Sequence, residues 1–216
     1  MTMDPLPRSL VCVVTLIVAM STEVARGQQE NAAITADGER LNRYFDSLDV
    51  EHHWLPGHSI HWRTGRDFPD GPRAATHCSS FVAAACDGLG VYILRPPQHS
   101  QILLANAQHE WLEQKGAENG WQKVRSEFEA QRLANQGWIV VVSHANPNKH
   151  RPGHIALVRP SNKSTDAIKA EGPDIIQAGR VNYSRTPMST GFRSPDTAVQ
   201  DHRVAFFAHL VASSND

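Results

Sequence analysis

The chain has no surplus of basic residues, because 21 lysines and arginines stand against 22 aspartates and glutamates, for a formal net charge of −1. Proteins that bind nucleic acid through its phosphates need such a surplus, so the composition argues against a nucleic-acid partner. The chain also lacks the low hydrophobicity of disordered proteins, since 40% of its 216 residues are hydrophobic. No repeat, low-complexity segment or linker is present, and we therefore expect one globular domain.

No apolar run is long enough to cross a bilayer as a helix, which takes about 20 residues. The run at residues 10–20 (LVCVVTLIVAM) follows Arg8 and contains only eleven residues. This length suits the apolar region of a secretory signal peptide. The sequence therefore predicts an exported protein, secreted or periplasmic, with no stable membrane anchor.

Small residues follow the apolar run at Ala25 and Gly27 and predict cleavage before Gln28. We accordingly expect a signal peptide at residues 1–27 and a single catalytic domain at residues 28–216.

Cysteine is scarce, with three residues in the chain, and Cys12 lies in the predicted leader. Exported proteins often pair their cysteines, which would join Cys78 to Cys86. If both lie on one helix, their eight-residue separation places them about 12 Å apart. A disulfide needs Cα atoms within about 7 Å. We therefore expect at least one free, potentially reactive thiol.

The pattern of apolar residues changes between the two halves of the chain. Helical spacing predicts helices at residues 36–48, 78–89, 100–115 and 126–135. Runs of β-branched residues predict strands at residues 138–143, 153–159, 174–178 and 204–211, the first two antiparallel. Residues 49–76 have no period and are rich in Pro, Gly, His and Trp, which predicts a long ordered loop. Helices followed by antiparallel strands indicate an α+β fold, with the N-terminal helices packed on a small antiparallel sheet.

Cys78 opens the second predicted helix. Unpaired backbone N–H groups and the positive end of the helix dipole converge at that position. They favour the thiolate, which is the nucleophilic form of cysteine, and they can stabilise an oxyanion on an attacked carbonyl. The alternative is a small buried core residue. Cys86 fits that alternative, because it lies in mid-helix after Ala83, Ala84 and Ala85.

A cysteine nucleophile needs a base, and His154 is the best candidate among twelve histidines. It is the second residue of a predicted strand, after Gly153, and shares a strand face with Ala156 and Val158. A histidine at this rim of a sheet can pack against the start of a helix. The alternative is an exposed histidine at a sheet edge.

These motifs together resemble a known family. The helix that opens with Cys-Ser-Ser-Phe-Val (78–82), the strand that ends at Ser143 and the run Gly-His-Ile-Ala-Leu-Val (153–158) resemble the NlpC-like cell-wall cysteine peptidases and the related CHAP amidases. The resemblance covers residues 54–178 and implies a papain-like α+β core. The chain departs from the family pattern at His77, where Asp is usual, and at Ser80, where Gly is usual.

The resemblance also implies a third catalytic residue on the strand after the histidine. Gln177 occupies that position, where His, Asn or Glu is more usual, and Asn182 is the second candidate. A glutamine oxygen can accept a hydrogen bond from the imidazole and fix its tautomer, but it carries no charge to stabilise an imidazolium.

The activity implied by the resemblance is hydrolysis of an amide bond, with a peptidoglycan stem peptide as the expected substrate and no cofactor or metal. Cys78 attacks the carbonyl carbon, His154 protonates the leaving amine and then activates water, and Gln177 orients His154. Backbone N–H groups near Cys78 form the oxyanion hole, with help from the 54–64 loop. We expect substrate contacts at three positions: Trp62, His77 and Asn182.

A second class of function uses the histidines at positions 52, 53, 58, 61 and 77, because imidazole is a common zinc ligand. Their spacings are not those of a helical zinc site, and no carboxylate motif completes a ligand set. A non-enzymatic or metal-binding exported protein that uses the 52–77 loop is one alternative. A wall-binding module that kept the fold and lost the chemistry is the other.

Overall fold

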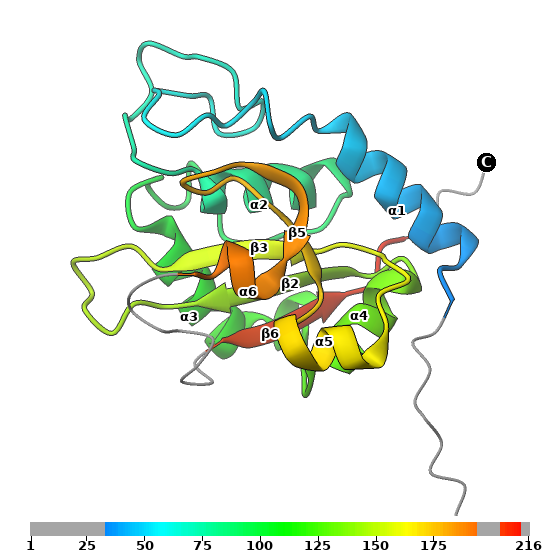
Figure 1. The fold of residues 1–216 in the computed structure, drawn as a ribbon. Coiled ribbons are helices and arrows are strands. Elements are labelled where there is room, and N and C mark those ends of the chain that lie inside the picture. Colours follow the sequence, from blue (N-terminus) through cyan, green and yellow to red (C-terminus); the bar gives the residue numbers. More distant parts are fainter. Residues whose placement is uncertain (1–32, 194–203, 213–216) are drawn as a thin grey trace, which may run out of the picture.

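A six-stranded antiparallel sheet forms the centre of the computed structural model, which describes residues 33–193 and 204–212 (Figure 1). The strand order is β1-β6-β2-β3-β4-β5. The strands are β1 (Gln122–Val124), β2 (Ile139–His144), β3 (His154–Val158), β4 (Asp174–Gln177), β5 (Tyr183–Pro187) and β6 (Ala205–His209). The predicted leader at residues 1–27 lies outside the described residues.

Helices precede the sheet and also connect its strands. They are α1 (Ala36–Ser47), α2 (Cys78–Gly88), α3 (Leu104–Lys115), a 3₁₀ turn η1 (Ala117–Asn119), α4 (Glu127–Asn135), α5 (Thr165–Glu171) and α6 (Met188–Gly191). Mixed helices and an antiparallel sheet confirm the α+β class. No helix among the described residues has both the length and the apolar character that a membrane span needs.

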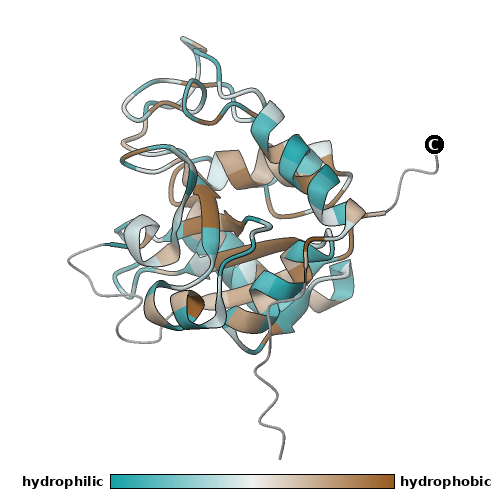
Figure 2. Cartoon of the chain, turned by 45° about the vertical axis from the view of Figure 1, so that its right-hand side comes forward, coloured by the Kyte–Doolittle hydropathy of each residue, from teal (hydrophilic) through white to brown (hydrophobic). Residues whose placement is uncertain are grey.

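Strand β2 has apolar side chains on both faces of the sheet, and all of its residues are buried. Ile139 and Val141 join an apolar cluster with residues of α1, α2 and α3. Val140 and Val142 join a second cluster with residues of α4 and α6. Helices therefore cover the sheet on both faces, which is more than the expected packing of N-terminal helices on a small sheet. Figure 2 shows the centre of the sheet mainly in the hydrophobic colours.

The strand pair that carries the predicted histidine is antiparallel, as expected. Residues of β2 and β3 pair in a register that sets Ser143 opposite Ile155 and His144 opposite His154. Helix α2 packs directly on β3. The start of α2 and the start of β3 are thereby held at the same end of the sheet.

The 48–77 segment lies above α2 in the view of Figure 1 and contains no helix or strand, as predicted. Two isolated bridges, Ser59 with Arg73 and Ile60 with Asp67, give it a fixed course. The buried Trp54 ring packs edge-on against Phe81 of α2, with ring centroids 5.3 Å apart. This segment is therefore part of the packed structure rather than a free loop.

The predicted first or last residues of some helices and strands were wrong. The helix expected from residue 100 begins at Leu104, because Leu103 has a left-handed backbone with φ of 57°, which cannot continue a right-handed helix. Five further elements were not predicted at all: η1, β1, α5, β5 and α6.

Candidate active site

Cys78 is the first residue of α2, at the helix end that faces the start of β3. Side chains cap α1, α4 and α5 at their N-termini: the hydroxyls of Thr35, Ser126 and Ser164 accept from backbone N–H groups of the first turn. Helix α2 has no such cap, and its first turn contains no acidic residue. The N–H groups at the start of α2 are therefore free to stabilise a negative charge.

The sulfur of Cys78 is surrounded by donors. It forms a hydrogen bond with the His154 side chain, and the backbone N–H groups of Ile155 and Ser79 donate to it. Burial acts to raise the pKa of the Cys78 thiol, but the charge of His154 and these hydrogen bonds outweigh it, so the pKa is lowered. Each of these contacts is stronger for a thiolate than for a thiol. The site therefore favours the nucleophilic form.

His154 is the first residue of β3, and its two ring nitrogens have different partners. Nε2 donates to Oε1 of Gln177 at 2.8 Å. Nδ1 is then the nitrogen that remains for Cys78. Burial acts to lower the pKa of His154, yet the hydrogen bond and charge of Cys78 and the hydrogen bond of Gln177 raise it. The opposite shifts of the Cys78 and His154 pKa values favour the thiolate–imidazolium form of the pair over the neutral form.

The side-chain amide of Gln177 is fixed in its orientation. Its Nε2 donates to the carbonyl of Val181 at 3.2 Å, so Oε1 is the atom that faces His154. Space for the amide depends on Gly191, where a Cβ atom would lie 2.6 Å from Oε1. The ring of Phe192 packs edge-on against His154, with centroids 4.6 Å apart. Gln177 and Phe192 together hold the imidazole on two sides.

Gly153 is the other position near His154 where a side chain cannot be accommodated. A Cβ atom at this residue would lie 2.1 Å from the carbonyl oxygen of His144 and 2.5 Å from Oδ1 of Asn106. Backbone atoms cannot give way as a flexible side chain can. The glycine before His154 is therefore needed for the close approach that starts β3.

The sequence placed Asn182 near the site as the second candidate for the third catalytic residue and as a substrate contact. Its Nδ2 donates instead to the carbonyls of Val50 and His53 at 2.7 and 2.9 Å. Its Oδ1 accepts from the N–H of Gly179 at 3.1 Å. Both ends of the amide bind backbone groups, so Asn182 ties the 48–77 segment to the β4–β5 turn, and Gln177 alone of the two contacts His154.

His77 was expected to contact substrate, but the structure gives it another place. Only 2% of the residue is exposed, and its Nε2 donates to the carbonyl of His58 at 3.0 Å. Burial lowers the pKa of His77. A neutral, inward-facing imidazole holds the 48–77 segment to the start of α2, and it presents no surface to a substrate.

Trp62, the remaining predicted substrate contact, is half-buried on the 48–77 segment. The guanidinium groups of Arg63 and Arg95 lie 5.2 and 6.0 Å from the centre of its ring. Its carbonyl accepts from Trp54 Nε1 at 2.9 Å. His154 lines a pocket whose lining does not include Trp62, so the structure does not bring the two residues together.

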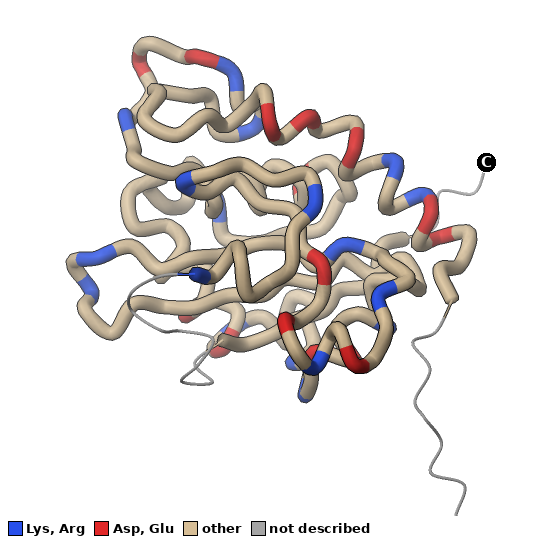
Figure 3. Tube along the Cα trace, viewed as in Figure 1, with Lys and Arg blue, Asp and Glu red and all other residues tan. Residues whose placement is uncertain are grey.

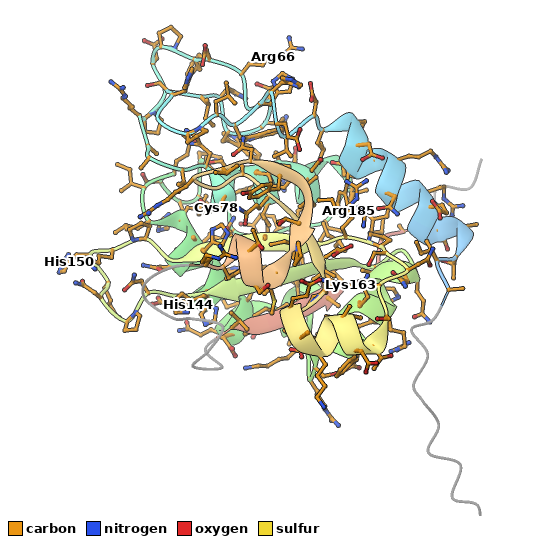
Figure 4. The ribbon with its side chains drawn as sticks, in the orientation of Figure 1. Arg66, Cys78, His144, His150, Lys163 and Arg185 are labelled. Carbon is orange, nitrogen blue, oxygen red and sulfur yellow. The ribbon has the colours of Figure 1, made fainter. Side chains whose placement is uncertain are left out.

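A pocket of about 600 Å³ opens beside the Cys78–His154–Gln177 group. His154 and Gln177 line it, as does Thr76, two residues before the cysteine. Cys78 is 4% exposed and does not line the pocket itself. In Figure 4 Cys78 lies at the left end of α2, above the end of the sheet that carries His144. The thiol is therefore next to the pocket through its contact with His154, which lines it.

Cys86 lies eight residues further along α2 and differs from Cys78 in the direction in which its surroundings shift the pKa of the thiol. Both cysteines are free, so the expectation of at least one free thiol is confirmed. Cys86 is completely buried, and burial raises the pKa of its thiol. It is a small apolar residue of the core.

The histidines of the 52–77 loop have separate partners. His52 bonds to Asp49 at 2.7 Å and His58 bonds to Asp67 at 2.8 Å, both at the surface. Within the part of the chain that the structure describes, no three His, Cys, Asp or Glu side chains are grouped so that they could hold a metal ion. The described loop thus offers no observation in favour of the metal-binding alternative.

Sequence reasoning missed several groups at the site. The backbone N–H of Ile155 and the ring of Phe192 contact the reactive pair, and neither is marked by a motif. Arg151, Arg180 and Arg193 line the pocket. Arg151 and Arg180 each lie three residues from a predicted site residue, His154 and Gln177, whereas Arg193 has no such neighbour in the sequence.

Replacement of Gln177 by alanine is expected to lower kcat for amide hydrolysis by roughly tenfold to a hundredfold, because a hydrogen bond to a charged group contributes about 1.5–3 kcal/mol. Gln177→Glu keeps an acceptor for Nε2 and should retain most of the activity, with the pH dependence assigned to His154 moved upward. Steady-state kinetics of the two variants across pH measure both effects. Equal activity of Gln177→Ala and wild type would remove Gln177 from the site.

In comparisons with known proteins, no family model matches the chain and no curated protein matches its sequence.

Proposed function

We propose that the protein is an exported cysteine hydrolase that cleaves an amide bond, with a peptidoglycan stem peptide as substrate, on a papain-like core. The observation that carries the proposal is the constellation of Cys78 at an uncapped helix start, hydrogen-bonded to His154, whose Nε2 donates to Gln177. A nucleophile, a base and a group that orients the base are the three parts that acyl transfer needs.

The first half of the reaction forms a thioester. The Cys78 thiolate attacks the amide carbon, and the carbonyl oxygen becomes an oxyanion. Uncapped N–H groups at the start of α2 stabilise that charge. The His154 imidazolium then gives its Nδ1 proton to the leaving nitrogen, the C–N bond breaks and the amine departs.

The second half restores the enzyme. His154, now neutral, takes a proton from a water molecule as that water attacks the thioester carbon. The C–S bond breaks, the carboxyl product leaves and Cys78 returns as the thiolate beside the imidazolium. Gln177 keeps Nε2 protonated throughout, so Nδ1 remains the nitrogen that exchanges the proton.

The peptidoglycan substrate rests on the sequence resemblance and on the predicted export, and the pocket is compatible with it. A volume of about 600 Å³ lies within the usual range for sites that bind small molecules and short peptides. Thr76 and His154 line the pocket, and the His154 side chain contacts the Cys78 sulfur.

Digestion of purified peptidoglycan tests the proposed function. Wild type is expected to release fragments in which one amide has been replaced by a new amine and a new carboxylate, which mass spectrometry identifies by the addition of one water per cut. Cys86→Ala is the matched control and should release the same fragments. Fragments that arise by cleavage of a sugar linkage, or equal release by Cys78→Ala, would contradict the proposal.

A further inference from the structure

The pocket beside His154 is lined by basic groups and by no acidic ones among the described residues. Its three arginines are Arg151, Arg180 and Arg193, and all three are exposed. In Figure 3 the β2–β3 loop and the β4–β5 turn show basic positions and no acidic position. Arg193 lies two residues after the end of α6. Three separate segments therefore direct positive charge to one pocket of a protein whose formal net charge is −1.

None of these arginines forms an ion pair with a residue that the structure describes. Basic residues elsewhere do so: Arg63 and Arg95 pair with Asp87, and Arg185 pairs with Asp174. The three guanidinium groups at the pocket are thus available to a ligand. A guanidinium presents parallel N–H donors that match the two oxygens of a carboxylate.

The backbone that carries each arginine is fixed, although the side chains themselves are exposed. Asn106, which is 8% exposed, donates from Nδ2 to the carbonyl of Arg151 at 2.9 Å. Oδ1 of the same residue accepts from the N–H of Asn146 at 3.0 Å, which holds the whole β2–β3 loop. The N–H of Arg193 donates to the carbonyl of Thr190 at 3.2 Å.

Arg180 lies in the turn that follows Gln177, the last residue of β4. Its neighbour Val181 accepts from Gln177 Nε2, and its neighbour Gly179 donates to Asn182. The backbone on both sides of Arg180 is thus hydrogen-bonded, on one side to Gln177, which positions His154. The same short turn sets both the orientation of the base and the place of the positive charge.

We infer that the pocket selects substrates with a carboxylate close to the amide that is cleaved, and that Arg151, Arg180 and Arg193 recognise it. This inference rests on the proposed function for the identity of the substrate as a peptide. The positive pocket raises the local concentration of an anionic substrate, and the guanidinium groups fix its register relative to Cys78. The peptide segments that fit are those whose residues beside the scissile amide carry free carboxylates.

Binding to the Cys78→Ala variant tests the inference without any need for turnover. The probes are soluble muropeptides released from purified peptidoglycan by a muramidase, either native or with their carboxylates converted to amides by carbodiimide and ammonium. Isothermal titration calorimetry is expected to show native fragments binding about tenfold more tightly than amidated ones at low salt, with the difference reduced as salt is raised.

Substitutions identify the arginines. Arg151→Gln, Arg180→Gln and Arg193→Gln combined in the Cys78→Ala background should abolish the preference for native fragments. The matched control combines Arg43→Gln, Arg66→Gln and Arg125→Gln, which removes the same charge from exposed residues outside the pocket and should keep the preference. All six residues are exposed, so both triple variants are expected to fold, and thermal unfolding checks this.

Three results would overturn the inference: equal binding of native and amidated fragments, an unchanged preference in the pocket variant, and absence of binding to either probe. If the proposed hydrolase function is wrong but the carboxylate recognition is right, the experiments give a different set of results. In that case wild type leaves the native fragments uncut, while Cys78→Ala still prefers them in a manner that depends on the three arginines.

Discussion

Replacement of Cys78 by alanine is expected to lower the rate of amide hydrolysis at least about a thousandfold, because the attacking atom is removed and the other hydrogen-bond partner of the His154 ring, Gln177, is not a nucleophile. Cys78→Ser should be nearly as inactive. A serine hydroxyl keeps the geometry but does not ionise at neutral pH, and the contacts that stabilise the thiolate cannot activate it to the same degree.

Two controls separate the chemistry from the fold. Cys86→Ala changes a completely buried cysteine of the same helix, costs on the order of 1 kcal/mol of stability and should keep wild-type activity. Thermal unfolding of Cys78→Ser should differ little from wild type. Hydrolysis by Cys78→Ser at the wild-type rate would show that another residue attacks the substrate.

Replacement of His154 by alanine is expected to lower kcat/KM by about a hundredfold to ten-thousandfold, the range that a general acid–base group contributes. The imidazole both protonates the leaving amine and lowers the pKa of the Cys78 thiol, so its loss affects both steps. His150→Ala is the matched control, because His150 is exposed on the adjacent β2–β3 loop and does not line the pocket. Unchanged kinetics in His154→Ala would contradict its assignment as the base.

The pH dependence of kcat/KM follows from the directions of the two pKa shifts. Activity needs the Cys78 thiolate and the His154 imidazolium together. It should rise as pH increases through the lowered pKa of Cys78, and fall as pH increases through the raised pKa of His154. In His154→Ala, burial acts on Cys78 without the opposing charge, so the residual activity should rise only at more alkaline pH.

Helices and strands with a strong apolar pattern were predictable from the sequence. Elements without such a pattern were missed. Strand β2 carries four consecutive β-branched residues and was found within one residue of its bounds. Strand β5 lies at the sheet edge, and of its residues only Thr186 is buried, so it has no apolar alternation. Helix α5 buries only Ile168, although Ser164 caps it and Gly172 ends it. Capping signals alone do not outweigh a missing apolar face.

The reactive pair was predictable because each member stands at the start of an apolar element. The sequence alone could not decide whether Gln177 or Asn182 contacts His154. Both residues lie on the β4–β5 hairpin, close to His154 in the sheet. The choice depends on the 48–77 segment, which offers the carbonyls of Val50 and His53 to Asn182 from far away in the sequence. A contact between such distant segments has no local signature in the sequence.

The basic character of the pocket was hidden for a similar reason. The three arginines that line the pocket lie in three different connections between helices and strands, at positions 151, 180 and 193. The formal charge of the whole chain is close to zero, so it gives no sign of a local excess. Only the antiparallel arrangement of β2, β3, β4 and β5, followed by α6, gathers these connections at one end of the sheet.

The most direct test of the thiolate–imidazolium pair is the rate of alkylation of Cys78 by iodoacetamide as a function of pH, with each cysteine quantified by mass spectrometry. In wild type, Cys78 should react as a thiolate well below the ordinary cysteine pKa of about 8.5, whereas Cys86 should remain unlabelled. In His154→Ala the profile of Cys78 should move to higher pH. A Cys78 that titrates at or above the ordinary value in wild type, or whose profile is the same in His154→Ala, would contradict the account.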